Sequence, residues 1–241
     1  MTAAGAGGRP RRAAVLALLV GAGIGAATAA AAGEVDILGP AAGGTYRVGV
    51  ESLQERRFRT VYRQAHDLSC GAAALASLLT YHYRRPVSEE EVAAAMRAAG
   101  DPAKIDRLGF SLLDMQRYLA GRGLAADGFR VNLDRLAAAG LPAITLMEAE
   151  GYRHFVLIKG IRGDTVLVGD PAKGIRVLRR QAFEAAWSGI AFLIRDGQTL
   201  ARTAFNRDEE WAAPAPAPLG TALDRGSLAD ITGIRAPFPR F

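Results

Sequence analysis

The only cysteine of this 241-residue sequence, Cys70, stands at a position suited to nucleophilic chemistry. It begins an apolar stretch of helical spacing, and Gly71 after it leaves space above the sulfur and the neighbouring backbone N–H groups. The thiolate is the reactive form of cysteine, and a helix N-terminus or a nearby imidazolium favours it. A structural cysteine would instead lie on the apolar face within a helix or strand. The position of Cys70 therefore predicts a reactive thiol.

A thiol nucleophile needs a base, and the sequence offers three histidines. His154 opens the apolar run Phe155–Ile158, so we expect its ring at the edge of a buried strand, where it can meet a helix end from another layer. His66 lies four residues before Cys70 in the same loop. His82 falls about 18 Å along the helix axis from the thiol, and we expect it in the core. His154 is therefore the predicted base, and an exposed strand-edge histidine is the alternative.

Asp170 is the acidic residue that could orient this histidine. It ends the apolar run Thr165–Gly169, and Pro171 after it favours an extended backbone. In two neighbouring antiparallel strands, a histidine at the start of one and an aspartate at the end of the next lie side by side. Asp-Pro is also a common turn dipeptide, which leaves a simple turn aspartate as the alternative.

The tetrahedral intermediate of such a reaction carries an oxyanion, which needs preorganised hydrogen-bond donors. The backbone N–H of Cys70 at the helix start can supply one donor. Gln64, six residues upstream, can fold its side-chain amide over the same position. These two groups are the predicted donors.

The elements that must position these residues change in period along the chain. Apolar residues from Leu75 to His82 follow the spacing of one helix face, and Asp67 and Ser69 before them are good capping residues. Helices come first and strands later, which favours an α+β fold with N-terminal helices packed on an antiparallel β-sheet. The predicted helices span residues 70–83, 88–99, 111–121, 133–139 and 181–187. The predicted strands span residues 45–51, 57–63, 142–147, 154–161, 165–169, 175–178 and 190–195.

Residues 1–32 have the composition of an export signal. Arg9, Arg11 and Arg12 precede a stretch of apolar or small residues that ends at Ala32. We expect cleavage there and a periplasmic mature protein; the alternative is an uncleaved signal, which would give a loose membrane association. Cleavage would lower the formal net charge from +6 to +3, because it removes three Arg and no acid and leaves 27 − 24.

The other end of the chain has a different composition. After about Thr203, Pro214, Pro216 and Pro218 alternate with alanine, which is typical of an extended or disordered tail. The predicted boundaries are 1–32 for the signal peptide, 33–56 for an N-terminal extension with a strand, 57–197 for the domain that carries these site residues and 198–241 for a Pro/Ala-rich tail.

Three runs of residues resemble motifs of the bacteriocin-processing, double-glycine leader family of papain-like cysteine peptidases. The runs are Gln64–Gly71, Tyr152–Leu157 and Gly169–Gly174, in the order and spacing of that family. The resemblance covers about Arg57–Ile194 and implies a papain-like cysteine peptidase fold. It also implies the roles of four residues: nucleophile for Cys70, base for His154, orienting partner for Asp170 and oxyanion donor for Gln64.

Three further segments resemble the stand-alone exported peptidases of functional-amyloid secretion systems: Arg56–Val61, Leu79–Tyr83 and Gly109–Met115. This likeness implies a cysteine endopeptidase that meets a protein of the amyloid export apparatus in the periplasm. The sequence has no second apolar span and no phosphate-binding loop, unlike the transporter-fused members of the family. ATP is therefore not an expected partner, and the bond that is cut stays open.

The predicted partner is a protein or peptide substrate. No basic stripe with interleaved aromatic residues points to nucleic acid. One cysteine and three dispersed histidines lack the spacing of a zinc site, and we expect neither a metal nor another cofactor. Two other functions stay open: a Cys-His-Asp acyltransferase would pass the acyl group to an amine, and a non-catalytic papain-like domain would bind a substrate without cutting it.

Overall fold

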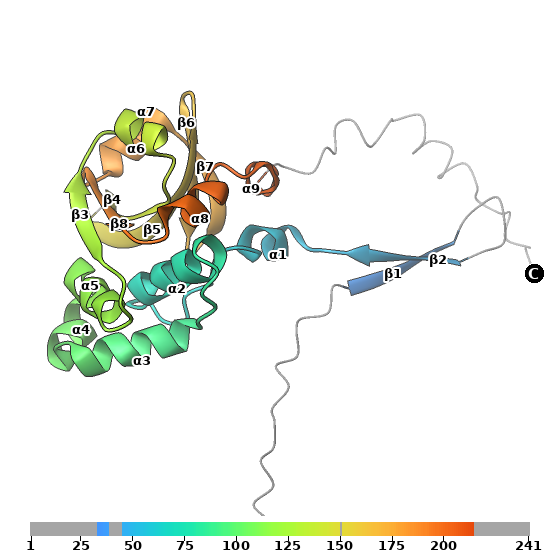
Figure 1. Cartoon of the computed structure of the whole chain (residues 1–241). Coiled ribbons are helices and arrows are strands. Elements are labelled where there is room, and N and C mark those ends of the chain that lie inside the picture. Colours follow the sequence, from blue (N-terminus) through green and yellow to red (C-terminus); the bar gives the residue numbers. More distant parts are fainter. Residues whose placement is uncertain (1–32, 39–44, 150, 215–241) are drawn as a thin grey trace, which may run out of the picture. The chain divides into compact units, whose positions relative to one another are not determined.

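The computed structural model describes residues 33–38, 45–149 and 151–214, in two units with a boundary between Val50 and Glu51. In the first unit, β1 (Gly33–Leu38) and β2 (Thr45–Val50) form an antiparallel pair (Figure 1). The strand predicted over 45–51 is therefore confirmed. The predicted signal peptide, residues 1–32, lies outside the described residues.

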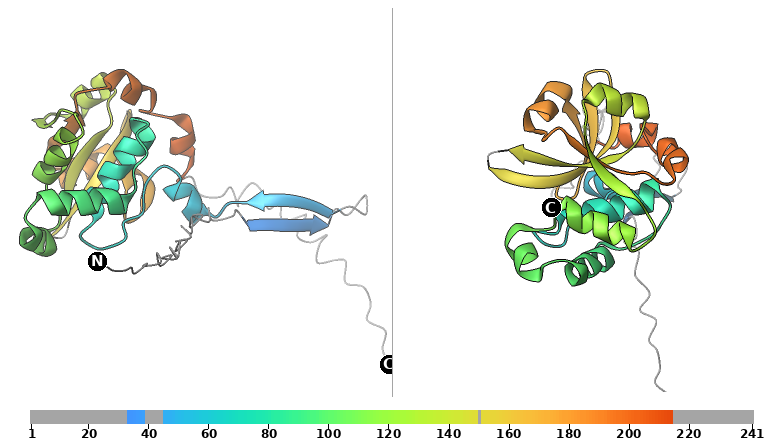
Figure 2. Two further views of the ribbon diagram at one scale, coloured as in Figure 1. Left: turned by 60° about the horizontal axis from the view of Figure 1, so that its bottom comes forward. Right: turned by 60° about the vertical axis from the view of Figure 1, so that its left-hand side comes forward.

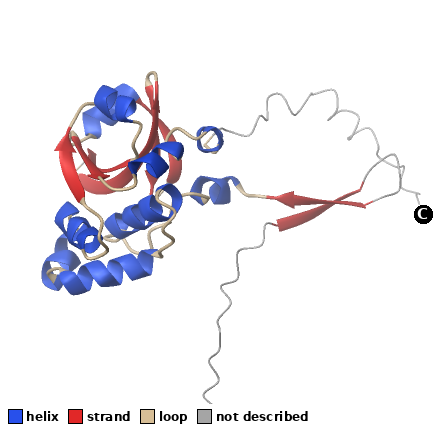
Figure 3. Ribbon diagram, viewed as in Figure 1, coloured by secondary structure: helices blue, strands red, loops and turns tan. Residues whose placement is uncertain are grey.

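In the described part of the second unit, six strands form one curved antiparallel sheet (Figures 1 and 3). Their order is β3-β8-β4-β5-β6-β7, so consecutive hairpins join the four strands from β4 to β7, while β8 inserts between β3 and β4. The strands are β3 (Ala126–Arg130), β4 (Ala143–Ala149), β5 (Tyr152–Arg162), β6 (Thr165–Asp170), β7 (Gly174–Arg179) and β8 (Ile190–Ile194).

The helix α2 (Cys70–His82) is buried along nearly its whole length, between the sheet and an outer layer of helices (Figure 2). It packs on β5 and β4 from one side and contacts α3 (Glu89–Ala99) and α5 (Leu112–Ala120) on the other. Four of its buried positions are alanine, which lets the neighbouring elements approach its backbone closely: Ala72, Ala73, Ala74 and Ala76. A helix that is apolar all round is expected where every face is covered.

The opposite face of the sheet is covered by α6 (Leu133–Ala139) and α7 (Arg180–Ala186). Strand β5 therefore contributes to two apolar clusters, with Phe155 and Leu157 in the cluster of α2 and with Val156 and Ile158 in the cluster of α6 and α7. This double burial explains why residues 155–158 form an unbroken apolar run instead of an alternating one. The predicted α+β class, with helices packed on an antiparallel sheet, is confirmed.

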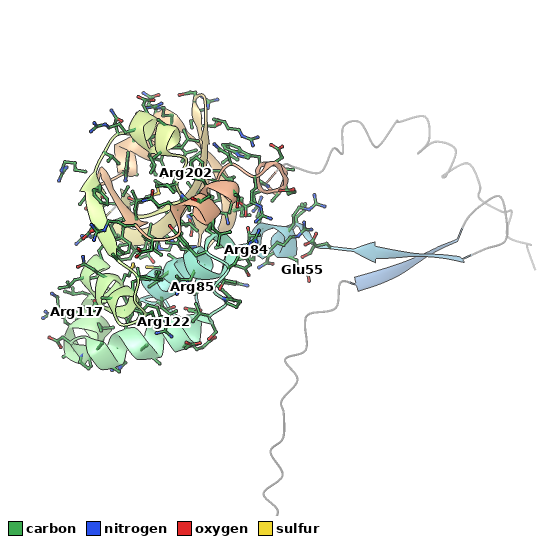
Figure 4. All side chains as sticks on the ribbon, viewed as in Figure 1. Glu55, Arg84, Arg85, Arg117, Arg122 and Arg202 are labelled. Atoms are coloured by element: carbon green, nitrogen blue, oxygen red, sulfur yellow. The ribbon has the colours of Figure 1, made fainter. Side chains whose placement is uncertain are left out.

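The outer helices are joined at the surface by Arg122, which projects from the turn after α5 (Figure 4). Its guanidinium lies 2.5 Å from Oε1 of Glu91 on α3 and 4.1 Å from the ring centroid of Tyr118. An exposed ion pair of this kind contributes about 0–1 kcal/mol. The buried apolar contacts of α3 and α5 therefore hold this layer in place.

Residues 198–214 do not follow the prediction, while the rest of the predicted tail, residues 215–241, lies outside the described residues. A Pro/Ala-rich tail was expected from 198, but residues 198–214 carry α8 (Gln198–Thr203) and α9 (Asp208–Ala212). Glu210 on α9 is buried, and its Oε1 lies 2.9 Å from Nζ of the fully buried Lys159 on β5. Because a buried lysine needs a partner, this ion pair and the buried Ala201 tie both helices to the domain.

Other elements also differ from the prediction. The strand expected over 57–63 is wrong, since α1 (Leu53–Phe58) forms there, started by a capping box between Ser52 and Glu55. The helix α4 (Pro102–Leu108) and the strand β3 were not predicted. Every helix within the described ranges is too short or too polar to span a bilayer.

Candidate active site

Cys70 is the first residue of α2 and is 8% exposed. Ser69 is the N-cap residue, as predicted, but its side chain makes no capping hydrogen bond. The hydroxyl of Ser69 instead contacts Glu89 and both backbone groups of His66. Because the first N–H groups of a helix have no intrahelical acceptor, those beside the thiol are left without a side-chain partner from Ser69.

His154 lies at the start of β5, and Asp170 ends β6. Leu157 faces Gly169 across the antiparallel ladder, which brings the two side chains to the same end of these strands. Nε2 of His154 lies 2.8 Å from Oδ1 of Asp170, with both side chains buried. The proximity predicted from the sequence is therefore found.

Asp170 is held by its own turn as well. Its Oδ1 accepts the backbone N–H groups of Ala172 at 2.9 Å and Lys173 at 3.2 Å, and Nη1 of Arg176 lies 3.5 Å from Oδ2. Burial raises the pKa of Asp170, but the hydrogen bond from His154, its charge and these other donors outweigh burial and lower the pKa. The carboxyl group is therefore ionised at neutral pH, while its turn fixes its orientation.

The imidazole of His154 is the charged partner of this pair. Burial lowers its pKa, but the hydrogen bond and charge of Asp170, together with the Cys70 thiol, outweigh burial and raise the pKa to about 9. Since Nε2 faces the carboxylate, Nδ1 is the nitrogen left for the thiol, and it has no hydrogen-bond partner among the described residues. The site can therefore hold an imidazolium next to Cys70 at neutral pH.

Gln64 lies in the loop before α2 and is tied to the turn of Asp170, because its backbone N–H donates to the carbonyl of Pro171 at 3.0 Å. Its side-chain Nε2 donates to the carbonyl of His66 at 3.1 Å, and its buried Oε1 has no partner in the described structure. An amide NH₂ group carries two hydrogens, so one of them is not used by His66. The predicted oxyanion donor is thus in the right loop with one hydrogen free.

The other two histidines do not belong to the ion pair. His82 is 1% exposed and neither ring nitrogen has a partner among the described residues. Burial, and then the positive charges of Lys159 and Arg207, hold its pKa well below the usual value. It is a neutral core residue, as predicted, while His66 is exposed in the loop before Cys70.

A cleft of about 590 Å³ reaches the thiol and has mostly apolar walls. One wall comes from α4, α5 and the segment between them, and the other from β4 and β5; the lining includes Leu108, Phe110, Leu113, Leu146 and Tyr152. Gly71 keeps this wall close to α2, since a Cβ atom there would lie 2.9 Å from Cε of Met115 and 3.1 Å from Cβ of Phe110.

Two residues at the site were missed by the sequence reasoning. The ring of Tyr152 stacks on that of His154, with centroids 5.7 Å apart and planes 25° apart. The sequence could have indicated this contact, because Tyr152 and His154 are two residues apart at the edge of a predicted strand and residues two apart on a strand share a face. Glu89 was missed because it stands among the acidic residues at the start of α3, where charge near a helix N-terminus is common.

Residues 59–199 match the Peptidase C39 family, and the chain belongs to this family of cysteine peptidases. The papain-like cysteine peptidase domain implied by the sequence motifs is thereby confirmed.

The proteins similar to the chain include two curated relatives and two solved structures. It is 42% identical over 152 residues to "Probable functional amyloid protease FapD" of Pseudomonas aeruginosa, covering 63% of this chain and 67% of that protein. It is 40% identical over 163 residues to the protein of the same name from Pseudomonas fluorescens, covering 68% and 72%. A double-glycine motif protease from an AMS/PCAT transporter, solved with a leader peptide, is 29% identical, covering 56% of this chain and 89% of that one, with a TM-score of 0.47. The peptidase domain of Streptococcus ComA is 18% identical, covering 56% and 96%, with a TM-score of 0.49.

Proposed function

We propose that this cysteine peptidase cuts a protein of a functional-amyloid secretion system, with Cys70 as the nucleophile, His154 as the base and Asp170 as its orienting partner. The observation that carries the proposal is the buried ion pair of His154, which leaves Nδ1 free beside the first residue of α2. A histidine held in this way can stabilise a thiolate and then act as an acid.

The reaction follows from these positions. The Cys70 thiolate attacks the carbonyl carbon of the scissile bond, and the imidazolium of His154 gives its proton to the leaving amine, so that the C–N bond breaks and a thioester remains. Neutral His154 then takes a proton from a water molecule whose oxygen adds to the thioester. Collapse of this second intermediate releases the new carboxyl end and restores the thiolate and the imidazolium.

The oxyanion of both intermediates requires donors. The backbone N–H of Cys70 lies at the start of α2, where no intrahelical acceptor is available to it. The second hydrogen of Gln64 Nε2 is the other proposed donor, since only one hydrogen is used by the carbonyl of His66. Removing one such donor costs about 100- to 1,000-fold in kcat.

The names of the similar Pseudomonas proteins support an amyloid-system protein as the substrate. The cleft supports a peptide with apolar side chains, because its walls carry Leu108 and Leu113, which are 61% and 50% exposed. Asp67 lies at the same cleft with Lys104 and Arg153, so the lining also carries charges of both signs.

The experiment is to incubate the purified chain with the secreted proteins of a functional-amyloid system and to sequence the new termini by mass spectrometry. Cleavage by the wild type and by His66→Gln, but not by Cys70→Ser or His154→Ala, supports the proposal. Incorporation of an added amine would favour an acyltransferase. Substrate binding without cleavage by any variant would favour a non-catalytic domain and would overturn the proposal.

We propose further that residues 1–32 direct export and that the mature protein acts in the periplasm. The support is their sequence alone, with basic residues before an uncharged stretch. Cell fractionation followed by N-terminal sequencing is the test. A new N-terminus near Gly33 in the periplasmic fraction supports cleavage, whereas an intact chain in the membrane fraction would point to an uncleaved anchor.

A further inference from the structure

Glu89 is a buried carboxylate that faces the loop before Cys70. It is the first residue of α3 and is 4% exposed, whereas Glu90 and Glu91 beside it are exposed. The backbone N–H of Ala65 donates to it and lies 3.0 Å from each of its oxygens. The hydroxyl of Ser69 lies 2.5 Å from Oε1. The two donors are thus the neighbours in sequence of Gln64 and Cys70.

The hydroxyl of Ser69 has a single hydrogen, so its contacts can be ordered. Its oxygen lies 2.9 Å from the carbonyl of His66 but closer to the carboxylate of Glu89, and hydrogen bonds to an ionised acceptor are shorter and stronger. The hydroxyl therefore donates to Glu89 and accepts the backbone N–H of His66 at 3.1 Å. Glu89 in this way orients Ser69, whose hydroxyl accepts the N–H of His66 while its backbone N–H donates to the carbonyl of His66.

The same loop carries the amide of Gln64. Its Nε2 donates to the carbonyl of His66, which also accepts the backbone N–H of Ser69 at 3.1 Å. A continuous chain of hydrogen bonds therefore runs from Glu89 through Ser69 and His66 to Gln64. None of these bonds involves His154 or Asp170, which are held by the sheet and by their own turn.

We propose that Glu89 is a positioning residue, which fixes the Gln64 amide relative to the Cys70 thiol without touching the substrate. This inference rests on the proposed function, because it gives Gln64 the oxyanion role. A buried carboxylate is costly unless donors satisfy it. A role in the charge of the helix N-terminus alone would be met as well by the exposed Glu90.

The test compares Glu89→Gln with Glu90→Gln as a matched control on the same helical turn. The replacement puts an NH₂ group against the N–H of Ala65, because both oxygens of Glu89 face that donor. We expect kcat on a cleaved peptide to fall about 10- to 100-fold in Glu89→Gln, part of what losing one oxyanion donor costs, with KM within about twofold. Alkylation of Cys70 by iodoacetamide should keep the wild-type pH profile, because that reaction has no oxyanion.

Two further variants test whether Glu89 acts through Gln64 and through Ser69. If Glu89 acts through Gln64, the double variant Glu89→Gln with Gln64→Ala loses no more activity than Gln64→Ala alone. Ser69→Ala removes one contact and should give a smaller fall in kcat, which keeps the inference testable if Glu89→Gln does not fold. The inference would be overturned by a wild-type kcat in Glu89→Gln, or by additive losses of activity in the double variant. If Glu89→Gln does not fold, a wild-type kcat in Ser69→Ala would overturn it instead.

A measurement independent of catalysis separates this inference from the proposed function. Amide hydrogen exchange in residues 64–69 should accelerate in Glu89→Gln and not in Glu90→Gln, whether or not the protein cleaves the chosen peptide. A wild type that cleaves nothing while the loop still loosens would contradict the proposed function only. Unchanged exchange in Glu89→Gln would contradict the role of Glu89 itself.

Discussion

Nε2 of His154 lies 2.8 Å from Oδ1 of Asp170, and their side chains are 10% and 6% exposed. The two residues come from adjacent strands, and the same carboxylate oxygen also accepts the backbone N–H groups of Ala172 and Lys173, which follow Pro171. The pair therefore sets both the orientation and the charge of the imidazole that faces Cys70.

Asp170→Asn should reduce the fraction of His154 that is held as an imidazolium beside the Cys70 thiol. Without the carboxylate, the pKa of His154 falls below about 9, because burial is then opposed only by Cys70. We expect kcat/KM to fall about 100- to 10,000-fold, the usual contribution of acid–base catalysis. The pH profile of Cys70 alkylation by iodoacetamide measures the change directly.

The control for this variant is Asp134→Asn, which removes an exposed carboxylate that pairs with Arg180. It should leave the alkylation profile and kcat/KM within about twofold, since an exposed pair contributes little. An unchanged profile in Asp170→Asn would show that the imidazole does not depend on this carboxylate.

The raised pKa of His154 also predicts a pH dependence of stability. Its pKa in the folded protein is about 9, above the 6.5 of an exposed histidine, so folding favours the imidazolium. The resulting stabilisation is fully present below about pH 6.5 and is lost as the pH rises through 9. The urea midpoint of the wild type should therefore decline more between pH 7 and pH 10 than that of His154→Gln.

His66→Gln is the control for general effects of losing a histidine, because His66 is exposed. It should keep the full pH dependence of the wild type over the same range. Equal declines in the wild type and in His154→Gln would rule out a raised pKa in the folded state. Asp170 has the opposite effect at low pH: because its pKa is lowered in the folded protein, the free energy of unfolding declines as the carboxylate is protonated in acid.

The three central site residues could be placed from the sequence because each follows a local signal. Cys70 begins a helix, while His154 and Asp170 bound the two strands of one hairpin, so strand lengths alone bring them together. The start of α4 could also have been predicted from the sequence, since Asp101 caps the helix and Pro102 occupies its first turn.

The features that escaped prediction depend on contacts between distant segments. β3 reads Ala-Asp-Gly-Phe-Arg, without alternation, and forms because β8 pairs with it. Lys159 and Glu210 read as surface charges, and only the fold shows that they bury each other. Glu89 resembles Glu90 in the sequence and differs only in the loop that packs over it.

Gly71→Ala should disturb both stability and the cleft. The added methyl group would meet Cε of Met115, which can move, and Cβ of Phe110, which is fixed to the backbone of the cleft wall. Overpacking of this kind costs about 1–3 kcal/mol in the free energy of unfolding. Urea unfolding and KM for a cleaved peptide are the measurements, and we expect KM to rise as Phe110 shifts.

Gly121→Ala provides the matched control, because a Cβ atom there would have its nearest neighbours at 3.6 Å and the backbone is already helical. It should be neutral or slightly stabilising, with KM unchanged. Wild-type stability and KM in Gly71→Ala would show that the wall of the cleft has more room than the structure gives it.

Glu210→Gln should destabilise the peptidase domain although it lies outside the region first assigned to that domain. Burial lowers the pKa of Lys159, and the charge of Glu210 opposes this effect. Removing the carboxylate therefore leaves a fully buried ammonium, whose only polar partner among the contacts described is Thr60. Breaking a buried pair in this way costs about 3–5 kcal/mol in the free energy of unfolding, measurable as a lower urea midpoint.

Glu209→Gln is the control. The side chain of Glu209 is 74% exposed, so its replacement should change the free energy of unfolding by less than about 1 kcal/mol. Equal midpoints for the two variants would mean that α9 is not part of the folded core.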